Sequence, residues 1–166
     1  MGSLVGMSPM PIATESLSSN PNSSIKLNRY EQDFYAWTQE QTQLLRTGQW
    51  QLIDIQNLAE EIEDMGRAEK RELESRLEVL LMHLLKWQFQ PSLRSRSWQL
   101  TIKEQRLRLQ RHLKQNPSLK SAIPDLFADV YRLAVVSAER ETSLDIFPDV
   151  CPYDFEQVMT EAFLPE

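Results

Sequence analysis

One stretch of the sequence, residues 67–90, constrains the fold more than any other. Its apolar residues recur at steps of three and four, which places them along one side of an α-helix. These residues are Leu73, Leu77, Leu80, Leu81, Leu84 and Trp87. From Val79 onward nearly every position is apolar, so neighbouring helices must cover this half on more than one side. We expect a long central helix that ends before Pro91, because proline disfavours helix at the residue that precedes it.

The rest of the sequence also predicts helices. Only 4 of the 166 residues are glycine, and no useful run alternates apolar and polar residues as a half-buried strand does. Leu, Glu, Gln and Arg, which favour helix, dominate. The length suits one domain with a substantial core. We therefore predict an all-α, single-domain bundle over residues 29–166, with about five main helices and a short C-terminal helix.

Residues 1–28 differ from the rest in composition. They contain seven serines, three prolines and no aromatic residue, and their only charged residues are Glu15 and Lys26. Such a segment cannot bury enough apolar surface to offset the entropy lost on ordering it. We predict a disordered N-terminal tail that acts as a spacer, with a flexible arm or a phosphorylation target as the alternative.

Gly66 leaves two arrangements open between Asp54 and Gln90. In one, a helix that begins after Asp54 ends at Gly66, and the chain turns back to form a hairpin with the long helix. In the other, a single bent helix tolerates the glycine. We favour a break or kink. In the hairpin, the acidic residues of segment 60–64 lie close to the basic residues of segment 67–71, which neutralise them.

The overall charge and the cysteine content restrict the classes of function. The formal net charge of -6 argues against duplex nucleic acid as the principal partner. Cys151 is the only cysteine and cannot form an internal disulfide, which fits a reducing compartment. No apolar run is long enough to span a membrane, and the N-terminus lacks a secretory pattern. We predict a cytoplasmic protein without membrane association, and the oligomeric state stays open.

Basic residues are concentrated between positions 94 and 120. This stretch holds eight of the 18 basic residues of the chain and a single acidic residue, Glu104. It can bind phosphate or nucleic acid, or it can pair with the acidic C-terminal segment that starts at Glu139. The candidate interaction surface within it consists of Arg94, Arg96, Arg106, Arg108, Arg111 and Lys114.

His83 is the first candidate for chemistry, because an imidazole titrates near neutrality and it borders the predicted core. If Gly66 turns a hairpin, Asp54 is the nearest carboxylate, and we predict a His83–Asp54 pair that organises the core. A hydrolase or metal centre around His83 is the alternative, although no nucleophile or second ligand occurs at a readable spacing. We assign no catalytic, metal-binding or cofactor-binding residue.

Several short sequence motifs, taken in order along the chain, resemble the bacterial domain of unknown function 29 family. The resemblance covers about residues 30–165. It rests on Tyr30-x-x-Asp33-Phe34-Tyr35-x-Trp37, Asp54-x-x-Asn57-Leu58-x-Glu60-Glu61-Ile62, His83-Leu84-Leu85-Lys86-Trp87, Ser97-Trp98-x-x-Thr101-Ile102 and Phe147-Pro148 with Cys151-Pro152-Tyr153. The resemblance implies a compact all-helical bundle. It implies no activity, because the activity of that family is unknown.

These features together predict a non-enzymatic protein–protein interaction module, either an adaptor or a small regulatory or neutralising partner. The aromatic first helix and the strong segregation of charge motivate this hypothesis, because complementary charge guides partner choice. The alternative is a nucleic-acid- or phosphate-binding protein that uses the basic stretch 94–120.

Overall fold

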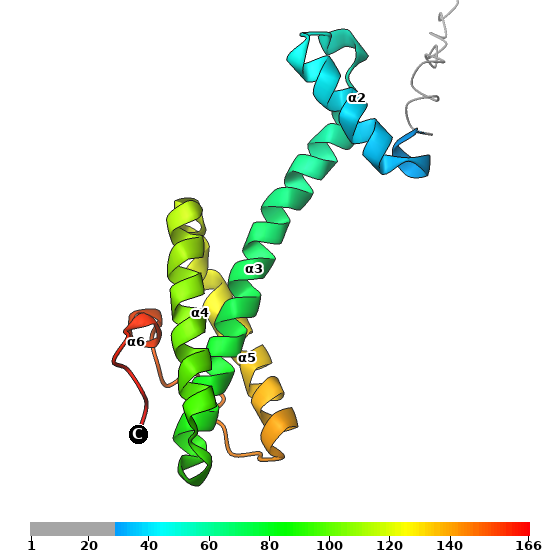
Figure 1. The fold of residues 1–166 in the computed structure, drawn as a ribbon. Helices are drawn as coiled ribbons and strands as arrows, with labels where there is room; N and C mark the ends of the chain where they lie inside the picture. Colours follow the sequence, from blue (N-terminus) through cyan, green and yellow to red (C-terminus); the bar gives the residue numbers. More distant parts are fainter. Residues whose placement is uncertain (1–28) are drawn as a thin grey trace, which may run out of the picture. The chain divides into compact units, whose positions relative to one another are not determined.

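The computed structural model describes residues 29–166, which form helices and connecting turns without a strand. The predicted all-α helical bundle is confirmed. The helices are α2 (Phe34–Arg46), α3 (Ile55–Phe89), α4 (Arg96–Gln115), α5 (Ile123–Thr142) and the short α6 (Phe155–Met159) (Figure 1). Three connections contain 3-10 helices: η1 (Trp50–Leu52), η2 (Pro91–Leu93) and η3 (Pro117–Ala122). The predicted disordered tail, residues 1–28, lies outside the described residues.

Residue contacts divide the chain into two compact units, one ending at Glu61 and the other beginning at Ile62. In the first unit, Asp33 caps α2 by accepting a hydrogen bond from the backbone of Ala36. The ring of Trp37 is buried and packs against Tyr30 and Phe34. This aromatic cluster anchors α2 within its unit.

Helix α3 runs through Gly66 without interruption, so the predicted break and hairpin are wrong. Among the described residues, a Cβ placed on Gly66 meets no atom of another element within 4 Å, so a side chain would fit there and no close contact calls for glycine. One glycine costs a helix about 1 kcal/mol, too little to break it without such a neighbour. The predicted neutralisation of the acidic run across a hairpin is also wrong. Arg67 instead pairs with Glu63 and Asp64, one turn earlier on the same helix.

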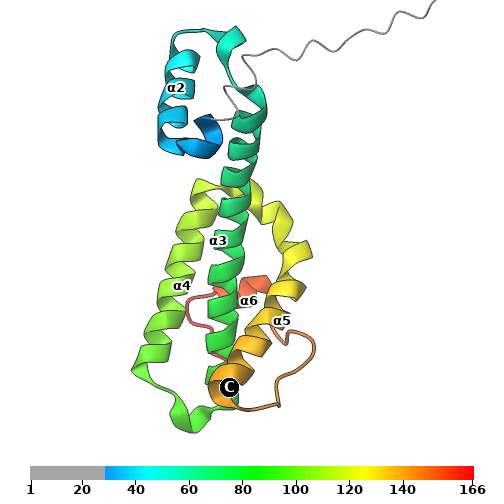
Figure 2. The ribbon, with the colours of Figure 1, turned by 90° about the vertical axis from the view of Figure 1, so that its right-hand side faces the viewer.

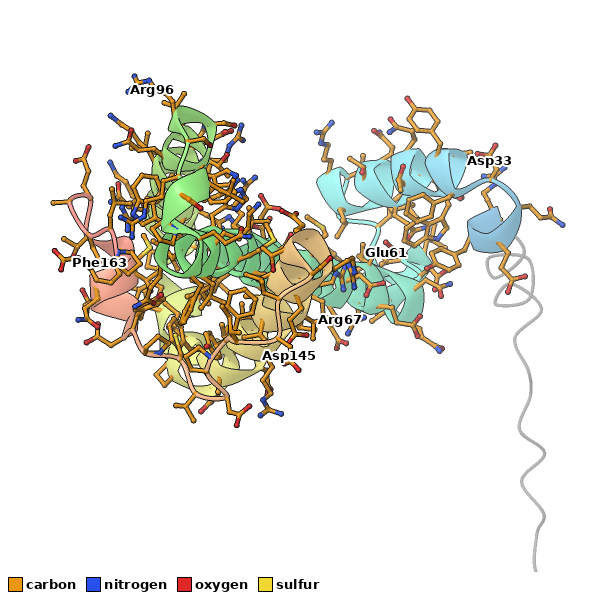
Figure 3. The ribbon with its side chains drawn as sticks, turned by 90° about the horizontal axis from the view of Figure 1, so that it is seen from below. Asp33, Glu61, Arg67, Arg96, Asp145 and Phe163 are labelled. Carbon is orange, nitrogen blue, oxygen red and sulfur yellow. The ribbon has the colours of Figure 1, made fainter. Side chains whose placement is uncertain are left out.

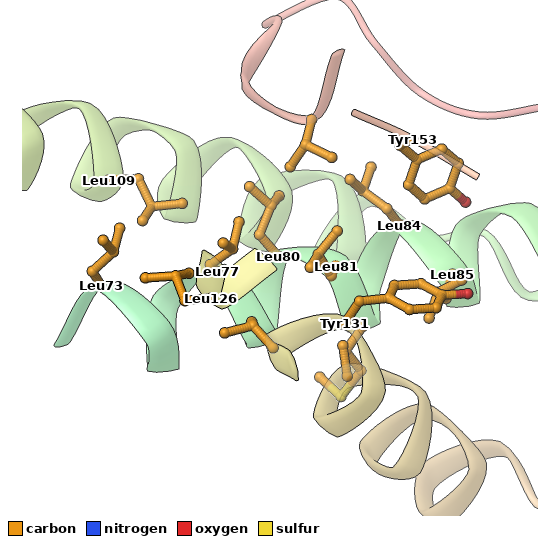
Figure 4. Close-up of a cluster of buried hydrophobic side chains, with 14 of the residues drawn as sticks. Leu73, Leu77, Leu80, Leu81, Leu84, Leu85, Leu109, Leu126, Tyr131 and Tyr153 are labelled. Carbon is orange, nitrogen blue, oxygen red and sulfur yellow. The ribbon is translucent and has the colours of Figure 1, made fainter. Parts of the chain in front are cut away.

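The core of the second unit lies along the C-terminal half of α3, between α4 and α5 (Figure 2). The predicted leucine stripe is confirmed, because its five leucines are fully buried and Trp87 packs against the core. Figure 4 shows these leucines facing Leu109 of α4 and Tyr131 of α5, with Tyr153 of the C-terminal segment nearby. Burial of apolar side chains from four segments stabilises this unit.

The helix ends follow local sequence signals. Ser95 caps α4 by accepting a hydrogen bond from the backbone of Trp98, and Pro124 occupies the first turn of α5, where its missing N–H costs nothing. Asp154 and Gln157 form a capping box that starts α6 immediately after the irregular segment 143–153. None of the helices in the described part of the chain combines the length and the apolar character that a bilayer span requires.

Candidate interaction groove

The structure does not bring the predicted pair His83 and Asp54 together. The carboxylate of Asp54 accepts hydrogen bonds from Trp37 Nε1, at 3.2 Å, and from Asn57 Nδ2, at 2.7 Å. The His83 ring instead contacts the carbonyl of Val79, at 2.8 Å from Nδ1. The predicted pair depended on a hairpin at Gly66, and α3 continues through that residue. Each group therefore has a separate structural role.

The surroundings of His83 favour its neutral form. Burial is the main cause and lowers the pKa of the ring, and the nearby charge of Lys86 lowers it further. The hydrogen bond to the Val79 carbonyl opposes this shift. Since a carbonyl accepts, the proton of the neutral ring lies on Nδ1. Within residues 29–166, no group of three or more His, Cys, Asp or Glu side chains is close enough to hold a metal ion.

The predicted basic surface is divided by burial. Arg106 is only 4% exposed, so the prediction that it belongs to the interaction surface is wrong. Arg94 donates to the carbonyl of Trp87 and lies over the Trp87 ring, and Arg108 pairs with Glu104. The remaining three predicted residues, Arg96, Arg111 and Lys114, are exposed and form no ion pair with the described residues. Figure 3 shows Arg96 projecting outward at the start of α4.

Arg106 fixes the C-terminal segment along α4. Its guanidinium donates from Nε to the carbonyl of Val158 at 2.7 Å, from Nη1 to Glu161 at 3.0 Å and from Nη2 to Phe163 at 2.6 Å. These planar donors satisfy three backbone acceptors of one segment. Burial lowers the pKa of this guanidinium, and the charge of Glu161 opposes the shift. The segment therefore runs beside α4, as Figure 1 shows.

A groove lies between α4 and the segment 155–164. It consists of three hollows of about 270, 30 and 840 Å³, which follow one another from the start of α4 to η3. Lys103, Arg106 and Glu161 line both the first and the second hollow, and Gln110 lines both the second and the third. Because adjacent hollows share these residues, we treat them as one feature, the α4 groove.

The α4 groove combines apolar walls with a mainly basic rim. Its apolar side chains include Leu100, Leu107, Leu113, Phe155, Met159 and Leu164. Its exposed charged side chains are Arg96, Lys103, Lys114, Lys120, Glu156 and Glu161. Four cations thus face two carboxylates, and the one ion pair among them, between Lys103 and Glu161, is 3.8 Å long with both side chains exposed. The pairing that was expected between the basic stretch and the acidic C-terminal segment is limited to this contact.

Comparison with protein families gives one match. The model of a family described as a domain of unknown function, DUF29, matches residues 29–164. The chain belongs to the DUF29 family. This match confirms the resemblance found in the sequence, and it takes in the whole α4 groove. Comparisons with curated proteins and with solved structures find no match.

A further hollow of this DUF29 chain, about 610 Å³, lies beside the groove. It is lined mainly by apolar residues of α5 and of the segment 149–155, and it shares Ile123, Pro124 and Phe155 with the end of the α4 groove. Burial raises the pKa of the Cys151 thiol in its wall, which keeps this thiol protonated. Burial, with smaller effects of Cys151 and Asp149, also raises the pKa of Tyr131 to about 12. This hollow therefore offers apolar contact rather than a nucleophile.

The sequence analysis missed two features of the DUF29 site, the burial of Arg106 and the second wall of the groove. The first of them does have a signal in the sequence. Arg106 lies four residues after Ile102 and three before Leu109, so it occupies a core position in the apolar stripe of α4. This spacing indicates burial. The second wall of the groove escaped because three carbonyls of residues 155–164 accept hydrogen bonds from Arg106, and a backbone acceptor leaves no mark on the sequence.

Proposed function

We propose that this DUF29 chain is a non-enzymatic protein–protein interaction module that binds a segment of a partner protein in the α4 groove. The observation that carries the proposal is the position of Leu100 and Leu107. These side chains are 50% and 57% exposed, and they line hollows whose rim is charged. An apolar centre within a polar rim is typical of surfaces that recognise proteins.

The geometry gives less support to the nucleic-acid alternative. Of the six predicted residues of the basic surface, Arg106 is buried against carbonyls, and both Arg94 and Arg108 are engaged by neighbours, so half of that surface is not free to bind phosphate. Exposed leucines among the remaining cations favour a partner that also has apolar side chains. The enzymatic alternative rests on His83, whose hydrogen bond to the Val79 carbonyl of its own helix is a structural role.

We also propose a cytoplasmic location. The only thiol of the chain, that of Cys151, is partly buried and unpaired, and the chain needs no disulfide for its helical core.

Affinity capture of the full chain from its own cells, with and without nuclease, tests the proposed function. We expect a stoichiometric protein that resists nuclease and is lost from the Leu107→Glu variant. Leu133→Glu is the matched control, because Leu133 is 55% exposed, lies on α5 and lines none of the hollows described above. Retention of the same partner by both variants, or a partner that disappears with nuclease, would contradict the proposal.

A further inference from the structure

We infer that the occupant of the α4 groove is an acidic amphipathic helix of the partner protein, whose carboxylates pair with the cations of the groove rim. This inference rests on the proposed function and specifies its ligand. It follows from three properties of the groove: the sign of its charge, its path along one helix, and the absence of a strand edge in the described residues.

The charge of the rim selects for acidic residues. Arg96, Lys114 and Lys120 are exposed, and none of them forms an ion pair with residues 29–166. Lys114 and Lys120 both line the largest hollow, where Glu156 is the single carboxylate. The chain as a whole carries a net charge of -6, so this local basic strip draws an acidic ligand to the groove while the remaining surface repels it.

The path of the groove favours a helical ligand. The α4 residues that line it recur at steps of three and four: Arg96, Gln99, Leu100, Ile102, Lys103, Arg106, Leu107, Gln110, Leu113 and Lys114. The groove therefore follows one face of α4 over its 20 residues, a length of about 30 Å at the usual rise of an α-helix. A second helix of similar length can pack along such a face.

The apolar contacts require an apolar stripe on the ligand. Leu100 and Leu107 are seven residues apart, which is two helical turns, and they offer repeated contacts to a neighbouring helix. The largest hollow adds apolar contacts from Leu113, Phe155 and Met159. Extended peptides commonly bind by backbone hydrogen bonds to the edge of a sheet, and residues 29–166 contain no strand that could offer such an edge.

A selection from random peptides tests this inference without assuming a partner. The full chain is immobilised and used to enrich a displayed library of 18-residue peptides. We expect enriched peptides to contain more Asp and Glu than Lys and Arg, and to place apolar residues at helical spacing. Lys114→Glu with Lys120→Glu should weaken their binding about tenfold, since each reversal replaces an exposed attraction by a repulsion.

The matched control is the double variant Lys70→Glu with Arg140→Glu. It changes the net charge equally, and both positions are exposed and outside the groove. Its affinity for the enriched peptides should stay within about twofold of the wild type.

Three results would overturn the inference. Enriched peptides that are neutral or basic, and that Leu107→Glu weakens, would refute the acidic ligand while leaving the proposed function intact. Failure to enrich any peptide that Leu107→Glu weakens would refute the acidic ligand, and capture of a nuclease-resistant partner would then decide the proposed function separately. Displacement of an acidic peptide by an equal concentration of an 18-nucleotide single-stranded RNA would show that the groove recognises a polyanion rather than an amphipathic helix.

Discussion

Replacing Arg106 with methionine tests whether the guanidinium holds the C-terminal segment against α4. Methionine keeps an unbranched apolar chain but removes every donor. The carbonyl of Val158 accepts a buried hydrogen bond, so its loss without water costs about 1–3 kcal/mol. The carbonyls of Glu161 and Phe163 are partly buried and regain water, at about 0.5–1.5 kcal/mol each. Since the substitution also removes a buried charge, we expect a net loss of about 2–4 kcal/mol in the free energy of unfolding.

Two measurements follow from this estimate. Denaturant unfolding gives the loss of stability, and hydrogen exchange of the amides in segment 155–164 shows whether that segment is released. Arg108→Met is the matched control on the same helix, because Arg108 is exposed and, among the described residues, forms an ion pair with Glu104 alone. We expect it to change stability by no more than about 0.5 kcal/mol. Arg106→Lys should show most of the loss in the free energy of unfolding that we expect for Arg106→Met, because one ammonium cannot replace three planar donors.

Arg106 does not hold the segment if the free energy of unfolding of Arg106→Met lies within about 0.5 kcal/mol of the wild type and hydrogen exchange in segment 155–164 is unchanged. That result would mean that apolar packing alone, for example of Val158 in the core, holds the segment.

Three further predictions concern α3 and its contacts. Gly66→Ala should raise the free energy of unfolding by about 0.5–1 kcal/mol in a denaturant titration, because the helix is continuous and a Cβ meets no atom there; a decrease would contradict the uninterrupted helix. The NMR titration midpoint of His83 should lie below 6.5. The neutral ring then contributes fully to the free energy of unfolding above pH 6.5, and this contribution should be lost as the pH falls through the lowered pKa. His83→Gln should abolish that part of the pH dependence, and a midpoint at or above 6.5 would refute the assignment. Glu141→Gln should lower the free energy of unfolding by about 1–2 kcal/mol, because it removes the carboxylate that pairs with the buried Lys86. The half-exposed position of Glu141 limits this loss. Adding Lys86→Met should make the combined loss smaller than the sum of the two single losses, and strict additivity would argue against the pair.

The core could be predicted from the sequence because its signal is periodic. Leu73 to Leu84 repeat at helical spacing over three turns, and only one face of a helix satisfies that pattern. Gly66 was mispredicted because its effect depends on a neighbour. A glycine within a helix costs about 1 kcal/mol wherever it lies, and only the structure shows that, within residues 29–166, the space beside it is open.

The candidate site could be predicted in part. The basic stretch does supply exposed cations at Arg96, Arg111 and Lys114, since charge is a property of the residue itself. The groove beside them could not be predicted, because it exists only where segment 155–164 lies along α4. In that placement three backbone carbonyls accept hydrogen bonds from Arg106, and carbonyls are the same for every residue type.

The use of backbone carbonyls as the acceptors for Arg106 has an evolutionary consequence. The hydrogen bonds of Arg106 all go to backbone carbonyls between Val158 and Phe163, so exposed residues of the groove wall can be replaced while these bonds are kept. Glu156, Thr160 and Glu161 are exposed members of the groove wall. Substitutions at these positions alter what the groove prefers to bind without altering how the wall is attached, so one scaffold can diverge towards different ligands at little cost in stability.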